Sequence, residues 1–223
     1  MIYTINLFLV ILYAVFSLPL LAVNGKYEIL KDQTIVVDQV TLYRIKALKD
    51  IRKGVKAGDL GGYIQSEANL KNAGKAWVGG DAKVYGDAIV SDRGLVAGKA
   101  QVYGNAKIYS RGQVLGSAKV YENAQVKEGK VIENAQVYGN AMIGAGEVGD
   151  SSKVYENAFI HGNIRGASII KGEAKVLSWA TVINSTLSQS ANIKGLIAVV
   201  TDSKICNPDV IKNKVNGRDD DCK

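Results

Sequence analysis

One seven-residue segment recurs five times in this chain of 223 residues, and this recurrence constrains the fold more than any other feature. The copies begin 17 or 18 residues apart and read AKVYGDA (82–88), AQVYGNA (100–106), AKVYENA (118–124), AQVYGNA (135–141) and SKVYENA (152–158). Weaker copies begin at residues 62, 168 and 185, so the frame starts eight times. Repeats this short are typical of a solenoid, in which each unit buries its apolar side only against its neighbours.

Within the repeat, aliphatic residues recur every six positions from Val84 to Val126. A helix would place apolar residues near every 3.6 positions, so this spacing indicates short strands instead. Six residues at about 3.3 Å each make one strand and a corner, and three such sides close a triangular coil. We therefore predict an all-β fold: a parallel β-helix of about eight triangular coils of 16–20 residues, capped at both ends.

A polar residue recurs at one corner of each copy. Stacked asparagines can pass amide hydrogen bonds from coil to coil, and asparagine tolerates the left-handed backbone that a corner often needs. We expect a structural ladder without a chemical role, formed by Asp87, Asn105, Asn123, Asn140 and Asn157.

A tyrosine directly follows the inward aliphatic residue in each copy, so the tyrosines should face outward as one stripe. The predicted stripe contains Tyr85, Tyr103, Tyr121, Tyr138 and Tyr155, flanked by Lys83, Lys119 and Lys153. Two interpretations remain open for it. The rings stack on one another along the solenoid, or they also bind a partner such as a sugar or another subunit.

Four further segments carry a resemblance to a known family. They are LYRIKALKD (42–50), KAGDLGGYI (56–64), EANL (67–70) and AWV (76–78). With the repeats, they resemble the YdcK-like proteins of bacteria and phages over residues 27–195. That resemblance implies a single-chain left-handed β-helix related to the hexapeptide-repeat acyltransferases. It implies little about activity, because the transferase label of the family rests on its fold.

The sequence divides into four segments. Residues 1–22 are predicted to be a signal peptide, residues 23–61 an N-terminal β cap, residues 62–199 the β-helix repeats and residues 200–223 a disulfide-bearing tail. The first 23 residues contain no charged side chain, which favours export; the alternative is an N-terminal membrane anchor. Cys206 and Cys222, the only cysteines, would pair in an oxidising compartment.

The formal net charge of +7 favours an anionic partner. An anionic glycan or envelope surface, or another protein, fits best, and a homo-oligomer remains open. A basic run from Arg44 to Lys56 is a second candidate patch, but no aromatic residue interleaves its IRKGVK part, which disfavours nucleic acid. The sequence indicates no cofactor.

The favoured function is an exported, non-enzymatic β-helix rod that serves as a scaffold or a binding module. The alternative is a hexapeptide-type acyltransferase with an inter-subunit site, in which His161, the only histidine, would be the general base. No acidic residue stands beside His161 in the sequence to orient it. Asp219 and Asp221 are weak calcium candidates, because no glutamate ends their loop.

Overall fold

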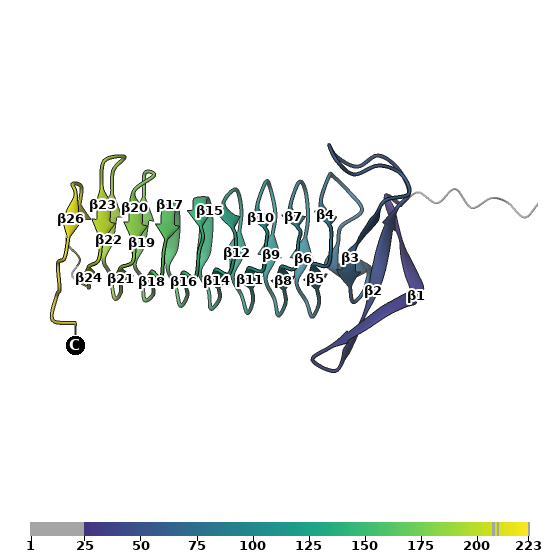
Figure 1. Ribbon diagram of the computed structural model, residues 1–223, viewed down its shortest axis with the longest axis horizontal. Helices are drawn as coiled ribbons and strands as arrows, with labels where there is room; N and C mark the ends of the chain where they lie inside the picture. Colours follow the sequence, from purple (N-terminus) through teal and green to yellow (C-terminus); the bar gives the residue numbers. More distant parts are fainter. Residues whose placement is uncertain (1–24, 207, 209, 223) are drawn as a thin grey trace, which may run out of the picture.

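Short parallel strands stack along one axis in the computed structural model of the protein, which describes residues 25–206, 208 and 210–222 (Figure 1). They form a β-solenoid of about nine turns. The predicted all-β fold of stacked parallel coils is thus confirmed. The left-handed sense that the resemblance implies stays a prediction.

Each turn has three sides, and the sides of successive turns align as three faces. The first face consists of β3 (Leu60–Ile64), β5 (Lys83–Val84), β8 (Gln101–Val102), β11 (Lys119–Val120), β14 (Gln136–Val137), β16 (Lys153–Val154), β18 (Ile169–Ile170), β21 (Thr186–Leu187) and β24 (Lys204–Ile205). The second face consists of β6 (Ile89–Val90), β9 (Lys107–Ile108), β12 (Gln125–Val126), β15 (Met142–Val148), β17 (Phe159–Arg165), β19 (Lys175–Leu177), β22 (Asn192–Lys194) and β25 (Val210–Ile211). The third face consists of β4 (Trp77–Val78), β7 (Leu95–Val96), β10 (Gln113–Val114), β13 (Lys130–Val131), the later parts of β15 and β17, β20 (Thr181–Ile183), β23 (Val199–Thr201) and β26 (Val215–Asn216).

The two seven-residue strands β15 and β17 run across the corner between the second and third faces. Strand β15 pairs with β12 through Met142 and Ile143 and with β13 through Glu147 and Val148. These coils are the shortened ones, and the residues they lack fall at this corner. Because the inward residues on either side stay in register, the coil shortens without disturbing the core.

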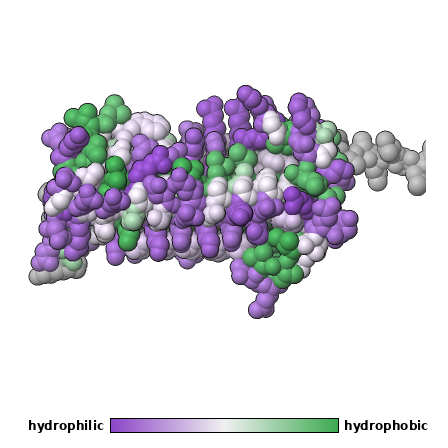
Figure 2. All heavy atoms as spheres, viewed as in Figure 1, coloured by the Kyte–Doolittle hydropathy of each residue, from purple (hydrophilic) through white to green (hydrophobic). Residues whose placement is uncertain are grey.

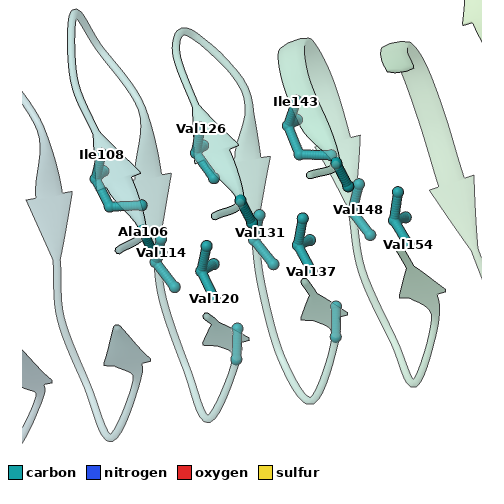
Figure 3. Close-up of a cluster of buried hydrophobic side chains, with 14 of the residues drawn as sticks. Ala106, Ile108, Val114, Val120, Val126, Val131, Val137, Ile143, Val148 and Val154 are labelled. Atoms are coloured by element: carbon teal, nitrogen blue, oxygen red, sulfur yellow. The ribbon is translucent and has the colours of Figure 1, made fainter. Parts of the chain in front are cut away.

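The inward aliphatic side chains form one continuous core along the axis (Figure 3). The residues predicted to point inward are all fully buried: Val84, Val90, Val96, Val102, Ile108, Val114, Val120 and Val126. Each stacks on its counterpart in the next coil, as Val120 does between Val102 and Val137. The six-residue spacing therefore sets the register of the whole solenoid.

An antiparallel hairpin precedes the coils and lies at one end of them (Figure 1). It consists of β1 (Tyr27–Val37) and β2 (Val40–Ala47), and β2 pairs antiparallel with β3. The register of β1 against β2 is irregular between Leu30 and Thr34.

The GDLGGYI and AWV segments meet where the hairpin packs on the first coil. A Cβ atom on Gly61 would lie 2.7 Å from the buried Trp77 ring and 2.5 Å from the Ile45 side chain. Only glycine permits so close an approach of strand β3 to these two side chains.

The coils continue into the segment predicted to be a tail. Strands β24, β25 and β26 extend the three faces through residue 216, which adds a turn to the eight frames of the sequence. The predicted disulfide is confirmed, because Cys206 is bonded to Cys222 with their Cα atoms 5.7 Å apart. A bridge of this span stabilises the last turn by about 3 kcal/mol on the chain-entropy model.

The predicted leader, residues 1–22, lies outside the described residues. Within the described part, the helical content is one 3-10 turn, η1 (Glu67–Asn69), and no helix is long and apolar enough to cross a membrane.

Replacing Val120 with aspartate should destabilise the fold by about 4 kcal/mol or more, because an unpaired charge would enter the core. Equilibrium urea unfolding measures this loss. Lys119→Asp is the matched control, since its side chain is only half-buried on the outer surface of the same strand. Equal unfolding midpoints for the two variants would contradict the inward position of Val120.

Lys26 is an unpaired cation in the interior at the base of the hairpin. Its side chain is 1 % exposed, and its Nζ has no hydrogen-bond partner among the described residues. Burial, and then the nearby charge of Lys49, lowers the pKa of Lys26 from 10.5 to about 8. Between these two pH values the unfolded chain binds more protons than the folded chain, so the stability should rise with pH.

Lys26→Met should therefore be more stable than the parent at pH 7, where the buried ammonium is charged. This advantage should shrink as the pH rises from about 8 to 10.5, because the parent lysine then loses its proton in the folded chain. Urea unfolding across this range measures it. A stability advantage that stays constant or grows with pH would contradict the lowered pKa of the buried Lys26.

Candidate functional site

The five predicted tyrosines stack in one row at the corner between the first and second faces, which we call the tyrosine edge. Successive ring centroids from Tyr85 to Tyr155 lie 5.1, 5.0, 4.8 and 4.8 Å apart, with the ring planes within 11° of parallel. This spacing is that of adjacent strands, so the repeat places each ring directly over the next. The predicted stacking is confirmed.

The first ring of the row is covered by the hairpin. Tyr85 is 6 % exposed, and its hydroxyl donates a hydrogen bond of 2.9 Å to Oδ2 of Asp38 in the turn between β1 and β2. The other four tyrosines are half-buried. Burial raises the pKa of Tyr121 to about 12 and also raises the pKa of Tyr103.

The faces of the inner rings are therefore occupied by their neighbours. A flat ligand such as a sugar ring cannot stack on Tyr103 or Tyr121 without separating two coils. Only the ring edges and hydroxyl groups remain for a partner, so the row serves first to stabilise the solenoid.

The asparagine ladder runs beside the tyrosines. The amide of Asn105 donates to Asn123, that of Asn123 to Asn140 and that of Asn140 to Asn157, at 2.9 to 3.1 Å. The predicted coil-to-coil bonds are confirmed for these four residues. Asp87 occupies the same corner position one coil earlier and is exposed, but no hydrogen bond joins its side chain to Asn105 within the described part of the chain.

Glutamates at this edge have a structural role that the sequence did not suggest. Glu122 and Glu156 adopt left-handed backbone angles, with φ of 56° and 57°. Their carboxylates accept hydrogen bonds from the backbone N–H groups of Gly139 and Gly172 in the following coils, at 2.8 and 2.7 Å. This hydrogen bond gives the backbone N–H group at the corner an acceptor, and it offsets the strain of the left-handed backbone at the glutamate.

The predicted lysines lie on the first face in one row, in register with glutamines of alternate coils. Lys83 pairs with Gln101 and Gln101 with Lys119, and the row continues through Gln136 to Lys153. Lys83 and Lys119 line an open groove of about 520 Å³ between the hairpin and the first face. Lys153 lies further along the solenoid, outside this groove.

The groove gathers residues that the periodic pattern did not single out. Its lining comprises Ile35, Tyr63, Asp81, Lys83, Lys99, Gln101, Ser117 and Lys119. Figure 2 shows hydrophobic side chains on the projecting hairpin beside the more hydrophilic body of the solenoid. The tyrosines of the tyrosine edge do not line this groove, so the structure separates the predicted lysines from the predicted aromatic stripe.

The groove carries an excess of positive charge. Its three lysines, Lys83, Lys99 and Lys119, face one acid, Asp81. The Asp81 carboxylate lies 3.5 Å from the Arg44 guanidinium, which neutralises it. The groove can therefore hold an anionic ligand.

Three of the six cations in the basic run from Arg44 to Lys56 are paired with acids, whereas Lys49, Arg52 and Lys53 take part in no ion pair among the described residues. Besides Arg44 with Asp81, Lys46 lies 3.2 Å from Glu28 and Lys56 lies 2.6 Å from Asp50. The hydrogen bond from Lys56 lowers the pKa of Asp50.

His161 lies half-buried on strand β17 with its ring edge-on to the ring of Trp179, at a centroid distance of 5.4 Å. No carboxylate is bonded to it among the described residues. A general base at this position would therefore lack the partner that has to orient it.

Asp219 and Asp221 are exposed, and Asp219 lies 3.9 Å from the ammonium of Lys204. Within the part of the chain that the structure describes, no three histidine, cysteine or acidic side chains are grouped to hold a metal ion.

No protein-family model and no curated protein matches this chain. The fold and the chemistry of its surfaces therefore carry what can be concluded about function.

Replacing Tyr121 with serine should destabilise the solenoid by about 1–3 kcal/mol, because two stacked ring pairs are lost. Tyr121→Phe keeps both pairs and should change the stability by less than about 0.5 kcal/mol. Urea unfolding distinguishes the two variants. Equal losses in both would show that the hydroxyl group, rather than the stacked ring, stabilises the row.

Proposed function

We propose that this protein is an exported, non-enzymatic β-solenoid that binds an anionic glycan in the groove between its hairpin and its first face. The observation that carries the proposal is the convergence of Lys83, Lys99 and Lys119 on one open groove whose single acid is already paired.

The dimensions of the groove suit an extended polyanion. Lys83 and Lys119 are two coils apart, which separates their Cα atoms by about 9–10 Å along the axis. Such regular spacing matches a chain that repeats its negative charge. Ile35 and the ring of Tyr63 add apolar surface, against which the C–H groups of a sugar can pack.

Two further assignments belong to the same proposal. Export is supported by the Cys206–Cys222 disulfide and by the uncharged N-terminal segment. Kinship with the YdcK-like, left-handed hexapeptide-repeat proteins is supported by the six-residue spacing and by the parallel coils. Neither assignment adds a reaction, and we propose a scaffold or binding module.

Fluorescence anisotropy with labelled dextran sulfate tests the groove, with uncharged dextran as the matched probe. The parent should bind the sulfated chain in a salt-dependent manner and ignore the uncharged one. Lys83→Glu/Lys119→Glu should weaken binding by about tenfold or more, since two attractions become repulsions.

Lys130→Glu/Lys175→Glu is the control, because it changes the net charge equally at exposed lysines on the other two faces, outside the groove. An equal loss of dextran sulfate binding in both variants would show that only net charge matters, and it would refute the groove as the binding site. Loss of binding in a folded Tyr103→Ser/Tyr121→Ser variant, with the lysines intact, would place the site on the tyrosine edge instead.

A further inference from the structure

The corner between the second and third faces, which we call the basic edge, concentrates positive charge. It comprises residues 71–75, 91–94, 109–112, 127–129, 144–146, 161–162, 177–180, 194–198 and 212–214, of which 144–146, 161–162 and 177–180 hold no lysine, arginine or acid. Backbone hydrogen bonds join these corners in sequence, from Lys75 to Asp92, from Arg93 to Ser110 and from Arg111 to Lys127. The basic edge carries eight cations, Lys71, Lys75, Arg93, Arg111, Lys127, Lys194, Lys212 and Lys214, against two acids, Asp92 and Glu128.

The other two edges have the opposite balance. The tyrosine edge, from residue 85 to 191, carries Asp87, Glu122, Glu156 and Glu173 against Lys171. The third edge, from residue 79 to 203, carries Asp81, Glu133, Asp150 and Asp202 against Lys99 and Arg165. Of the three edges of the triangular solenoid, only the basic edge therefore carries a clear excess of positive charge.

The cations of the basic edge are free to meet a partner. All eight are exposed. None of them takes part in an ion pair within the described residues. Asp92 is engaged in the fold, since its Oδ2 accepts a hydrogen bond of 2.9 Å from the backbone N–H of Ser110.

At the C-terminal end of the basic edge, two adjacent loops carry large apolar side chains in solvent. Trp179 is 48 % exposed, Leu196 76 % and Ile197 71 %. The loops belong to consecutive coils, because Leu177 pairs with Lys194 at their bases. Figure 2 shows hydrophobic atoms gathered at one end of the upper edge of the solenoid, with hydrophilic side chains standing along the rest of that edge.

We propose that the basic edge rests on an anionic lipid bilayer, with Trp179, Leu196 and Ile197 inserted into its interface. Tryptophan favours the boundary between headgroups and acyl chains, and exposed aliphatic side chains gain burial there. The cations, which lie in the first four and the last two coils of this edge, add attraction to anionic headgroups towards both ends of the rod. Contact between Trp179 and the His161 ring holds the indole in place before it meets lipid.

Two other binding partners for the basic edge fit these observations less well. A soluble polyanion would use the cations but would leave the three apolar side chains in water. A second copy that paired through the same edge would bring eight cations against eight cations, which is repulsive. Only a surface that is both anionic and apolar matches the cations of the edge together with its exposed apolar side chains.

Vesicle flotation with equal parts of phosphatidylglycerol and phosphatidylcholine tests the proposal, with pure phosphatidylcholine as the matched surface. The chain is used without residues 1–22, because that uncharged segment would itself enter lipid, and every contact described above lies in the residues retained. The parent should bind the anionic vesicles, and binding should fall by about tenfold or more in Arg93→Glu/Arg111→Glu and in Leu196→Asn/Ile197→Asn.

Lys83→Glu/Lys119→Glu has the same net charge as Arg93→Glu/Arg111→Glu. It should bind vesicles like the parent, although it loses two lysines of the groove. This control keeps the bilayer proposal separate from the glycan proposal. Tryptophan emission should shift to the blue on anionic vesicles, and the shift should vanish in Trp179→Phe, since the remaining tryptophan, Trp77, is buried.

Three results would overturn the proposal. The first is undiminished binding by the Arg93→Glu/Arg111→Glu variant. The second is an equal loss in the Lys83→Glu/Lys119→Glu control. The third is vesicle-bound protein in which the emission of Trp179 does not move, since the apolar loops would then lie outside the bilayer.

Discussion

The structure depends on one constraint: a single aliphatic side chain must point inward every six residues, directly above its counterpart in the coil below. Side chains alternate between the two surfaces of a strand, so a shift of one residue would turn every valine of that coil outward. The narrow core leaves no room for such a shift. Fully buried residues such as Val102, Val120 and Val137 therefore fix the backbone hydrogen bonds of the first face, and the other two faces follow.

Once the coils are in register, any residue at a given corner becomes part of a column with a spacing of about 4.8 Å. The tyrosines and asparagines of one edge become stacked rings and linked amides. The arginines and lysines of another become an unpaired basic row. At this spacing an uncompensated row of like charges destabilises the fold, and a surface that supplies the opposite charge would relieve it. Columns of different chemistry thus give one simple fold several distinct surfaces.

Distinct sites arise where the periodicity ends. The hairpin of β1 and β2 departs from the axis and encloses one side of the first face, which turns a flat row of lysines into a groove. Asp38 at its turn also covers the first tyrosine of the row. At the opposite end, the loops that carry Trp179 and Ile197 project from the coils and expose apolar side chains. Repetition therefore provides the rigid frame, and its interruptions provide selectivity.

The sequence by itself determined the fold class, the inward residues, the stacked tyrosines and asparagines, and the disulfide, because each depends on local spacing or on a pair of unique residues. It could also have predicted the ninth turn, since Ile205 and Ile211 keep the six-residue spacing. Only the tertiary structure decided that the hairpin folds over the row of Lys83 and Lys119 and that Arg44 neutralises Asp81. These contacts join residues that are far apart in the chain or depend on where a non-repeating segment folds, and no local pattern encodes that placement.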